Sequence, residues 1–69
     1  MHFLPNQKRL LHEKKELEER IHGLSHFVKG RHFETVPLYE RSLRLKQLKV
    51  MKEYLDILNE LVKIWKEQG

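Results

Sequence analysis

Cationic side chains gather at two places in this sequence where an anion could bind. Lys8 and Arg9 fall in the first turn of the first predicted helix, beside backbone N–H groups that have no partner within the helix. Cations are mildly unfavourable at the positive end of the helix dipole, and a bound anion would reverse that sign. Lys29 and Arg31 flank Gly30 in the predicted turn. Both clusters indicate a possible anion site, with solvated surface cations as the alternative.

Two histidines and two serines are the remaining residues with potential chemistry. His22 and His26 stand at i, i+4, a spacing that can place two imidazoles on one metal ion. No third ligand is evident, so we expect an exposed pair on a polar face, with no metal and no cofactor. Ser25 and Ser42 lack triad partners, and the chain has no cysteine, no glycine-rich phosphate loop and no nucleophile elbow. We therefore expect a protein that is not an enzyme.

The spacing of apolar residues predicts an all-α fold, an antiparallel hairpin of two long helices with a short N-terminal arm. We expect one helical-hairpin domain over residues 1–69, with the arm at 1–5, the first helix at about 6–29, the turn at 30–36 and the second helix at about 37–67. Asn6 is the expected N-cap of the first helix, and Gly30 is its expected stop. Pro37 suits the first turn of the second helix.

The second predicted helix has more apolar surface than one neighbouring helix can cover. Its first seam is Leu48, Met51, Leu55, Leu58, Val62 and Trp65, and its second seam is Val50, Tyr54, Ile57, Leu61 and Ile64. At ~100° per residue the two seams lie roughly 110° apart. The first helix has one matching seam, interrupted by Lys14. Because an antiparallel neighbour covers only one seam, we expect the hairpin to assemble into a homo-oligomeric helical bundle whose function lies at its interfaces.

Length, charge and composition narrow the kinds of partner that we expect for this protein. Sixty-nine residues bury little apolar area alone, which also favours association. The net charge of +4 suggests an anionic partner, but acids and bases are interleaved along the helices without the continuous basic stripe typical of DNA or RNA binding. No apolar run approaches the ~20 residues of a membrane span, and the opening Met-His-Phe-Leu-Pro lacks the features of a signal peptide. We expect a cytoplasmic protein without membrane or nucleic-acid partners.

A longer pattern of residues resembles a known family. It comprises Gln7, Arg9, Glu13, Lys14, Leu17, Ile21, Leu24 and Phe27, then Phe33, Glu40, Leu43, Gln47, Met51, Tyr54, Leu58 and Val62. This pattern resembles the short helical-hairpin proteins with which bacteriophages sequester cyclic nucleotides against host CBASS and Thoeris immunity. The resemblance implies a homo-oligomer, typically a hexamer, in the cytoplasm of the infected host. It also implies pockets between protomers that hold cyclic dinucleotides, cyclic trinucleotides or cyclic ADP-ribose derivatives without cleaving them.

The resemblance and the cationic clusters together suggest a set of ligand-binding residues. We expect phosphate contacts from Arg9, Lys14 and Lys29, with Arg31 beside them in the turn. Base edges or stacking are assigned to Gln7 and His12. Some members of the family stack a base on an aromatic ring at the position of Lys14, and Phe3, His12 or a neighbour's aromatic could substitute here. Two other interpretations stay open, a helical oligomerisation or adaptor module and a small nucleic-acid-binding protein.

Overall fold

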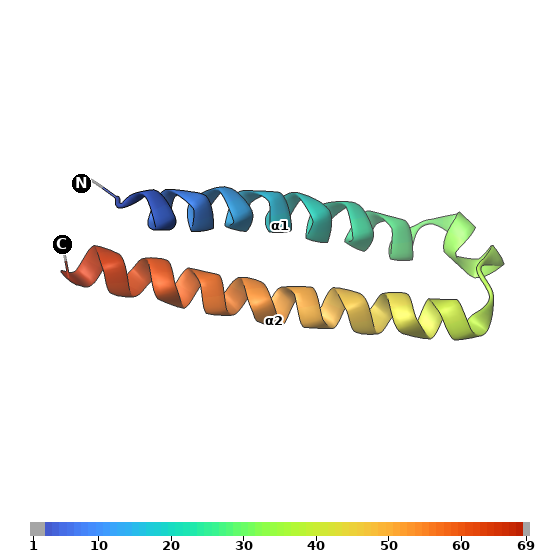
Figure 1. Ribbon diagram of the computed structural model, residues 1–69. Coiled ribbons are helices and arrows are strands. Elements are labelled where there is room, and N and C mark those ends of the chain that lie inside the picture. Colours follow the sequence, from blue (N-terminus) through green and yellow to red (C-terminus); the bar gives the residue numbers. More distant parts are fainter. Residues whose placement is uncertain (1–2, 69) are drawn as a thin grey trace.

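The computed structural model describes residues 3–68, which form two long helices joined by a short helical turn (Figure 1). Helix α1 spans Pro5–Lys29, the 3-10 helix η1 spans Arg31–Thr35, and helix α2 spans Leu38–Gln68. The long helices run antiparallel, so both chain ends lie at one end of the rod and η1 lies at the other. The rod measures 48 × 16 × 15 Å. The predicted all-α hairpin is confirmed, while residues 1 and 2 of the expected arm and residue 69 lie outside the described part.

Helix α1 begins earlier than predicted, so the assignment of its cap to Asn6 is wrong. The cap residue is Leu4, whose carbonyl accepts hydrogen bonds from the N–H groups of Gln7 and Lys8, each at 2.9 Å. Pro5 is the first helical residue, where its missing N–H costs nothing and its fixed φ suits the helix. The Leu4 N–H donates to Gln7 Oε1 at 2.8 Å, so the glutamine side chain closes the helix end in place of a capping hydroxyl.

The predicted turn is more ordered than a loop. Helix α1 ends at Lys29 as expected, and the Gly30 N–H donates to the Phe27 carbonyl at 3.1 Å. A single 3-10 turn follows, and Pro37 lies just before α2, not within it. The Pro37 carbonyl accepts the Arg41 N–H at 2.9 Å. Pro37 therefore acts at the cap of α2, whereas the sequence predicted it within the first turn.

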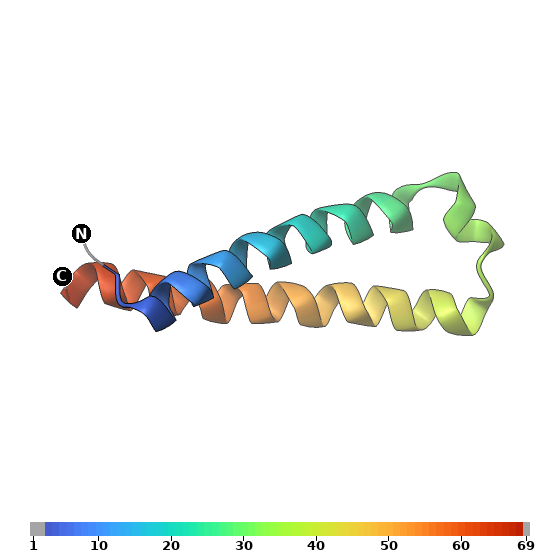
Figure 2. The ribbon, with the colours of Figure 1, turned by 45° about the horizontal axis from the view of Figure 1, so that its top comes forward.

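The first apolar seam of α2 forms the core against α1, as predicted. Leu48, Leu58 and Val62 are buried together with Leu17 of α1, and the other members of that seam are half-buried. Leu17 and Leu58 keep only 3% and 2% of their surface exposed. The two helices lie at an angle to each other, since the gap between their ribbons is nearly even in Figure 1 but widens towards η1 in Figure 2.

The second seam of α2 stays largely uncovered and continues further than the sequence pattern suggested. Val50, Tyr54, Ile57 and Ile64 are 40–57% exposed, and Leu61 is half-buried. The same row extends through Leu43 and Tyr39, 50% and 78% exposed, towards the start of α2. We call the seven residues of this row the α2 strip: Tyr39, Leu43, Val50, Tyr54, Ile57, Leu61 and Ile64.

The extent of exposed surface shows how little of this chain is covered. The accessible surface is 5823 Å², whereas a compact monomer of 8.5 kDa is expected to expose about 4,700 Å². From their exposed fractions, the six exposed members of the α2 strip leave roughly 600 Å² accessible, at the upper end of the apolar patches found on typical monomers. Over residues 3–68, neither long helix carries an apolar stretch sufficient to cross a bilayer.

Candidate ligand-binding site

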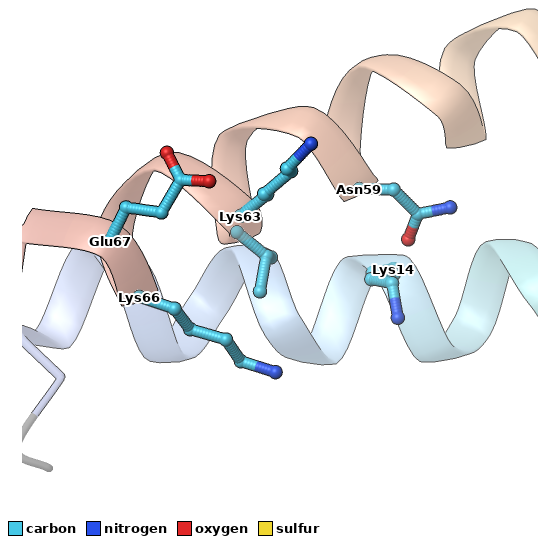
Figure 3. A pocket seen from close by; sticks show the side chains of 6 residues that line it. Lys14, Asn59, Lys63, Lys66 and Glu67 are labelled. Atoms are coloured by element: carbon cyan, nitrogen blue, oxygen red, sulfur yellow. The ribbon is translucent and has the colours of Figure 1, made fainter.

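A hollow of about 310 Å³ lies between the two helices near the chain ends (Figure 3). One residue from α1 and five from α2 line it: Lys14, Asn59, Val62, Lys63, Lys66 and Glu67. In Figure 3 the Lys66 side chain points to the side of α2 on which the α1 ribbon is seen. The side chains of Lys63 and Glu67 point to the other side of α2. We call this hollow the lysine groove.

Helix periodicity explains why these residues meet. On α2, Asn59, Lys63 and Lys66 are spaced i, i+4, i+7 and therefore share one face beside the buried seam. On α1, Lys14 is one turn before the buried Leu17 and occupies a seam position that faces α2. Its side chain is only 26% exposed, because its aliphatic stem lies along the apolar seam while the ammonium group reaches the edge.

The lysine groove combines positive charge with an apolar floor. Three lysines and one glutamate are among its lining residues, and Val62, 8% exposed, lies among them. Lys14 Nζ lies 3.8 Å from Glu18 Oε1, at the long end of the range for an ion pair. Asn59 adds an amide, which can both donate and accept hydrogen bonds. Such a surface suits a ligand that has phosphate charge and a flat ring, because ammonium groups make strong charge-assisted bonds to phosphate.

The structure separates the residues that were expected to bind phosphate. Lys14 lines the lysine groove, but Lys29 lines a different hollow of about 210 Å³ with His22, Ser25 and His26. The two lysines are fifteen residues apart on α1, a rise of roughly 22 Å. Arg9 lies about 140° around α1 from Lys14, on the opposite flank of the hairpin. One chain therefore does not bring Arg9, Lys14 and Lys29 together.

The other expected ligand residues are also dispersed. His12 is exposed on the outer face of α1 and pairs with Glu16, with 2.7 Å between Nε2 and Oε1. Arg31 is exposed in η1, at the far end of the rod from the lysine groove. Phe3 packs near Trp65, with 6.4 Å between ring centroids. Gln7 is half-buried and uses its Oε1 in the cap of α1.

The two histidines at i, i+4 lie close together, as their spacing requires. The rings of His22 and His26 meet edge to face at a centroid distance of 5.7 Å, and both residues are exposed on the surface of α1. Among residues 3–68, no group of three side chains is arranged to hold a metal ion.

The flank opposite the lysine groove carries the one side-chain hydrogen bond between α1 and α2 among the described residues. Tyr54 donates its hydroxyl to Glu13 Oε1 at 2.5 Å. This hydrogen bond, with desolvation and the negative charge of Glu13, raises the pKa of Tyr54 above its usual value of 10.0. The bond ties one member of the α2 strip to α1, so the two flanks of the hairpin differ in chemistry.

The groove residues on α2 escaped the sequence analysis. The sequence pattern does not single out Asn59, Lys63 and Lys66, and it does not predict the Tyr54–Glu13 pair. The available signal was Lys14 itself, because a lysine at a seam position must reach an edge of the helix pair. Polar residues of α2 at i, i+4, i+7 beside the seam were the natural candidates to line that edge.

These features define a class of protein, a small helical hairpin with a groove that is lined by lysines of both helices. The family model named Sequestin matches residues 4–60, most of the chain, and the protein belongs to the Sequestin family. The match is consistent with the sponge-type phage family that the sequence resembles. Neither a curated protein nor a solved structure matches the chain.

Membership bears on the site in two ways. The name of the family denotes sequestration, which implies binding rather than catalysis. The matched segment contains Lys14 and Asn59 but ends before Lys63 and Lys66. The last two lysines of the groove thus lie in a part of α2 that the family model does not cover.

Proposed function

We propose that this protein sequesters cyclic nucleotide second messengers during phage infection and holds them without cleavage. The observation that carries the proposal is the lysine groove, which Lys14, Lys63 and Lys66 line beside the buried Val62, in a chain of the Sequestin family. Cyclic dinucleotides are the first candidates, and cyclic trinucleotides and cyclic ADP-ribose derivatives share the same chemistry of phosphate and base.

The groove offers a partner for each part of such a ligand. The ammonium groups of Lys14 and Lys66 bind a phosphodiester through charge-assisted hydrogen bonds. The Asn59 amide meets a base edge, because it can donate and accept at once. Val62 supplies an apolar surface under the base. Sequestration requires tight binding, and a nanomolar dissociation constant corresponds to about 12 kcal/mol.

A second copy of the chain is needed to complete the site. The groove is an open hollow on a narrow rod, whereas sites for small ligands bury roughly 70–90% of the ligand surface. A neighbouring chain would cover the exposed side and bring its own Arg9, Lys29 or Arg31, which one chain alone keeps away from Lys14. The exposed α2 strip supports self-association on the opposite flank of the hairpin, so a further chain of the oligomer would cover the groove. The resemblance to the sponge proteins suggests six chains.

In the cytoplasm of the infected bacterium, stoichiometric capture would lower the free messenger below the threshold of the host effector. CBASS or Thoeris signalling would then stop although the messenger is still being made. The protein needs no catalytic group for this purpose, since binding alone removes the signal.

Isothermal titration calorimetry with a panel of cyclic dinucleotides, cyclic trinucleotides and cyclic ADP-ribose isomers tests the proposal. We expect nanomolar binding of at least one compound, which chromatography then recovers intact after the protein is denatured. No heat with any compound at micromolar protein, or recovery of a cleaved product, would contradict it.

Two neighbouring lysines provide a matched test of the groove. Lys14 lines the groove, whereas Lys15 is exposed on the outer face of α1. Lys14→Ala should weaken binding of the messenger at least tenfold, and Lys15→Ala should leave the affinity within about twofold of the wild type. Equal effects of the two substitutions would remove the groove from the proposal.

A further inference from the structure

We propose that two copies of this chain pair through the α2 strip with their α2 helices antiparallel. The inference rests on the self-association proposed above, and it adds the contact surface, the orientation and the residues that fix it. Three properties of α2 carry it: the apolar area that is exposed, the distribution of charge along the helix, and one lysine within the strip.

The exposed area is of the size that a stable pair of chains needs. The strip runs along α2 from Tyr39 to Ile64, a rise of roughly 37 Å. Its exposed side chains leave roughly 600 Å² accessible, close to the ~800 Å² per partner of a standard interface once flanking residues are added. Tyr54 enters such an interface with its hydroxyl already bonded to Glu13, so its burial leaves no unpaired polar group.

Charge along α2 favours the antiparallel orientation. Between residues 38 and 51 the helix has four basic residues and one acidic residue, a net charge of +3; they are Arg41, Arg44, Lys46, Lys49 and Glu40. Between residues 52 and 68 it has three basic and four acidic residues, a net charge of −1; they are Lys52, Lys63, Lys66, Glu53, Asp56, Glu60 and Glu67. Antiparallel pairing places the basic half of each helix against the acidic half of the other, whereas parallel pairing places the basic halves together.

Lys46 defines the contact more closely, because it is the charged residue that interrupts the strip between Leu43 and Val50. In the register that overlaps the strip completely, Lys46 is level with Ile57 of the second copy, and Leu43 lies within one residue of being level with its Leu61. Glu53 and Glu60 of the second copy then lie about one turn, or ~5 Å, to either side of the Lys46 ammonium group. Helix periodicity puts all three on the same flank of the strip, and a two-fold axis between antiparallel helices brings like flanks together.

Charge exchange tests the pairing. Lys46→Glu should weaken self-association at least tenfold in analytical ultracentrifugation, because each new carboxylate meets Glu53 and Glu60 of the other copy. The triple variant Lys46→Glu, Glu53→Lys, Glu60→Lys should recover most of the wild-type affinity. Circular dichroism checks that the variants keep their helices. An unchanged dissociation constant for Lys46→Glu, or a triple variant no better than the single one, would overturn the inference.

Cysteine cross-linking gives a second readout that charge effects do not influence, since the wild-type chain has no cysteine. A mixture of Leu43→Cys and Leu61→Cys chains should form the mixed disulfide dimer on mild oxidation. Either variant alone should not form one, because antiparallel pairing holds position 43 of one copy roughly 27 Å from position 43 of the other. Disulfide dimers of Leu43→Cys alone would indicate parallel pairing and overturn the proposal.

The outcomes also separate this inference from the proposed function. A wild-type protein that stays monomeric at every concentration would refute both self-association and the antiparallel pair. An oligomer that ignores the charge exchange and gives the wrong cross-links would refute the pair alone.

Discussion

Two neighbouring residues of α2 allow the core and the proposed interface to be measured separately. Leu58 is 2% exposed and belongs to the core of the hairpin, whereas Ile57 is 57% exposed in the α2 strip. Leu58→Ala should lower the free energy of unfolding by about 2–5 kcal/mol. A domain below ~70 residues rarely has more than about 3–5 kcal/mol available from its core, so this variant should be largely unfolded.

Ile57→Ala should leave the isolated hairpin intact and act on association. Its exposed fraction of 57% corresponds to roughly 100 Å², so removing most of the side chain costs about 2 kcal/mol per copy if that surface is covered, at ~25 cal/mol per Å². A two-fold pair loses it twice, which raises the dissociation constant by about 10³. Alanine is a strong helix former, so α2 itself should not weaken.

The assay is sedimentation equilibrium combined with urea unfolding at two chain concentrations a hundredfold apart. For the wild type, the unfolding midpoint should rise with concentration, since association stabilises the folded chain. For Ile57→Ala this dependence should shrink strongly. Leu45→Ala serves as the control, because Leu45 is 50% exposed but lies on another face of α2. An Ile57→Ala variant that associates as tightly as the wild type would refute the argument that the strip is an interface.

Three further predictions concern the site and the helix contacts. Lys66→Ala should weaken binding of a cyclic dinucleotide and flatten its salt dependence, because one phosphate contact is lost; calorimetry at several salt concentrations would show an unchanged slope if Lys66 does not touch the ligand. In a Tyr39→Phe background, the phenol absorbance of Tyr54 should titrate above pH 10, since its pKa is raised by Glu13, and Glu13→Gln should bring it back; the stabilising contribution is present below about pH 10 and is lost as the pH rises through the folded pKa. Gln7→Ala should lower the free energy of unfolding by about 1 kcal/mol through loss of the cap, while Gln7→Glu keeps an acceptor and should retain the wild-type stability; equal stability of all three chains in thermal melts would argue against the capping bond.

The fold was predictable because the spacing of the apolar residues and the residues typical of helix ends indicate the same two helices. Leu48, Leu58 and Val62 belong to a seam whose members alternate at spacings of three and four residues, and Gly30 ends the first helix where the apolar pattern stops. The start of α1 was misplaced because Asn6 is a strong cap by residue type. The structure instead uses the side chain of Gln7 and the position of Pro5, a combination that outweighs a single preference.

The candidate site was predictable only in part, because it depends on how two helices meet. Lys14 was found from the sequence, since a lysine in an apolar seam stands out within one helix. Lys63 and Lys66 were missed, because their approach to Lys14 depends on the antiparallel register and not on any pattern within α2. The separation of Arg9 from Lys29 follows from the straightness of α1, which keeps residues on different turns and flanks apart.

Native mass spectrometry of the wild-type protein mixed with the panel of cyclic nucleotides tests the central claim most directly. We predict a complex of several chains whose mass includes at least one intact cyclic nucleotide, and the ligand should remain bound after buffer exchange. A single chain that carries no ligand at micromolar concentrations of protein and of every compound would contradict the account.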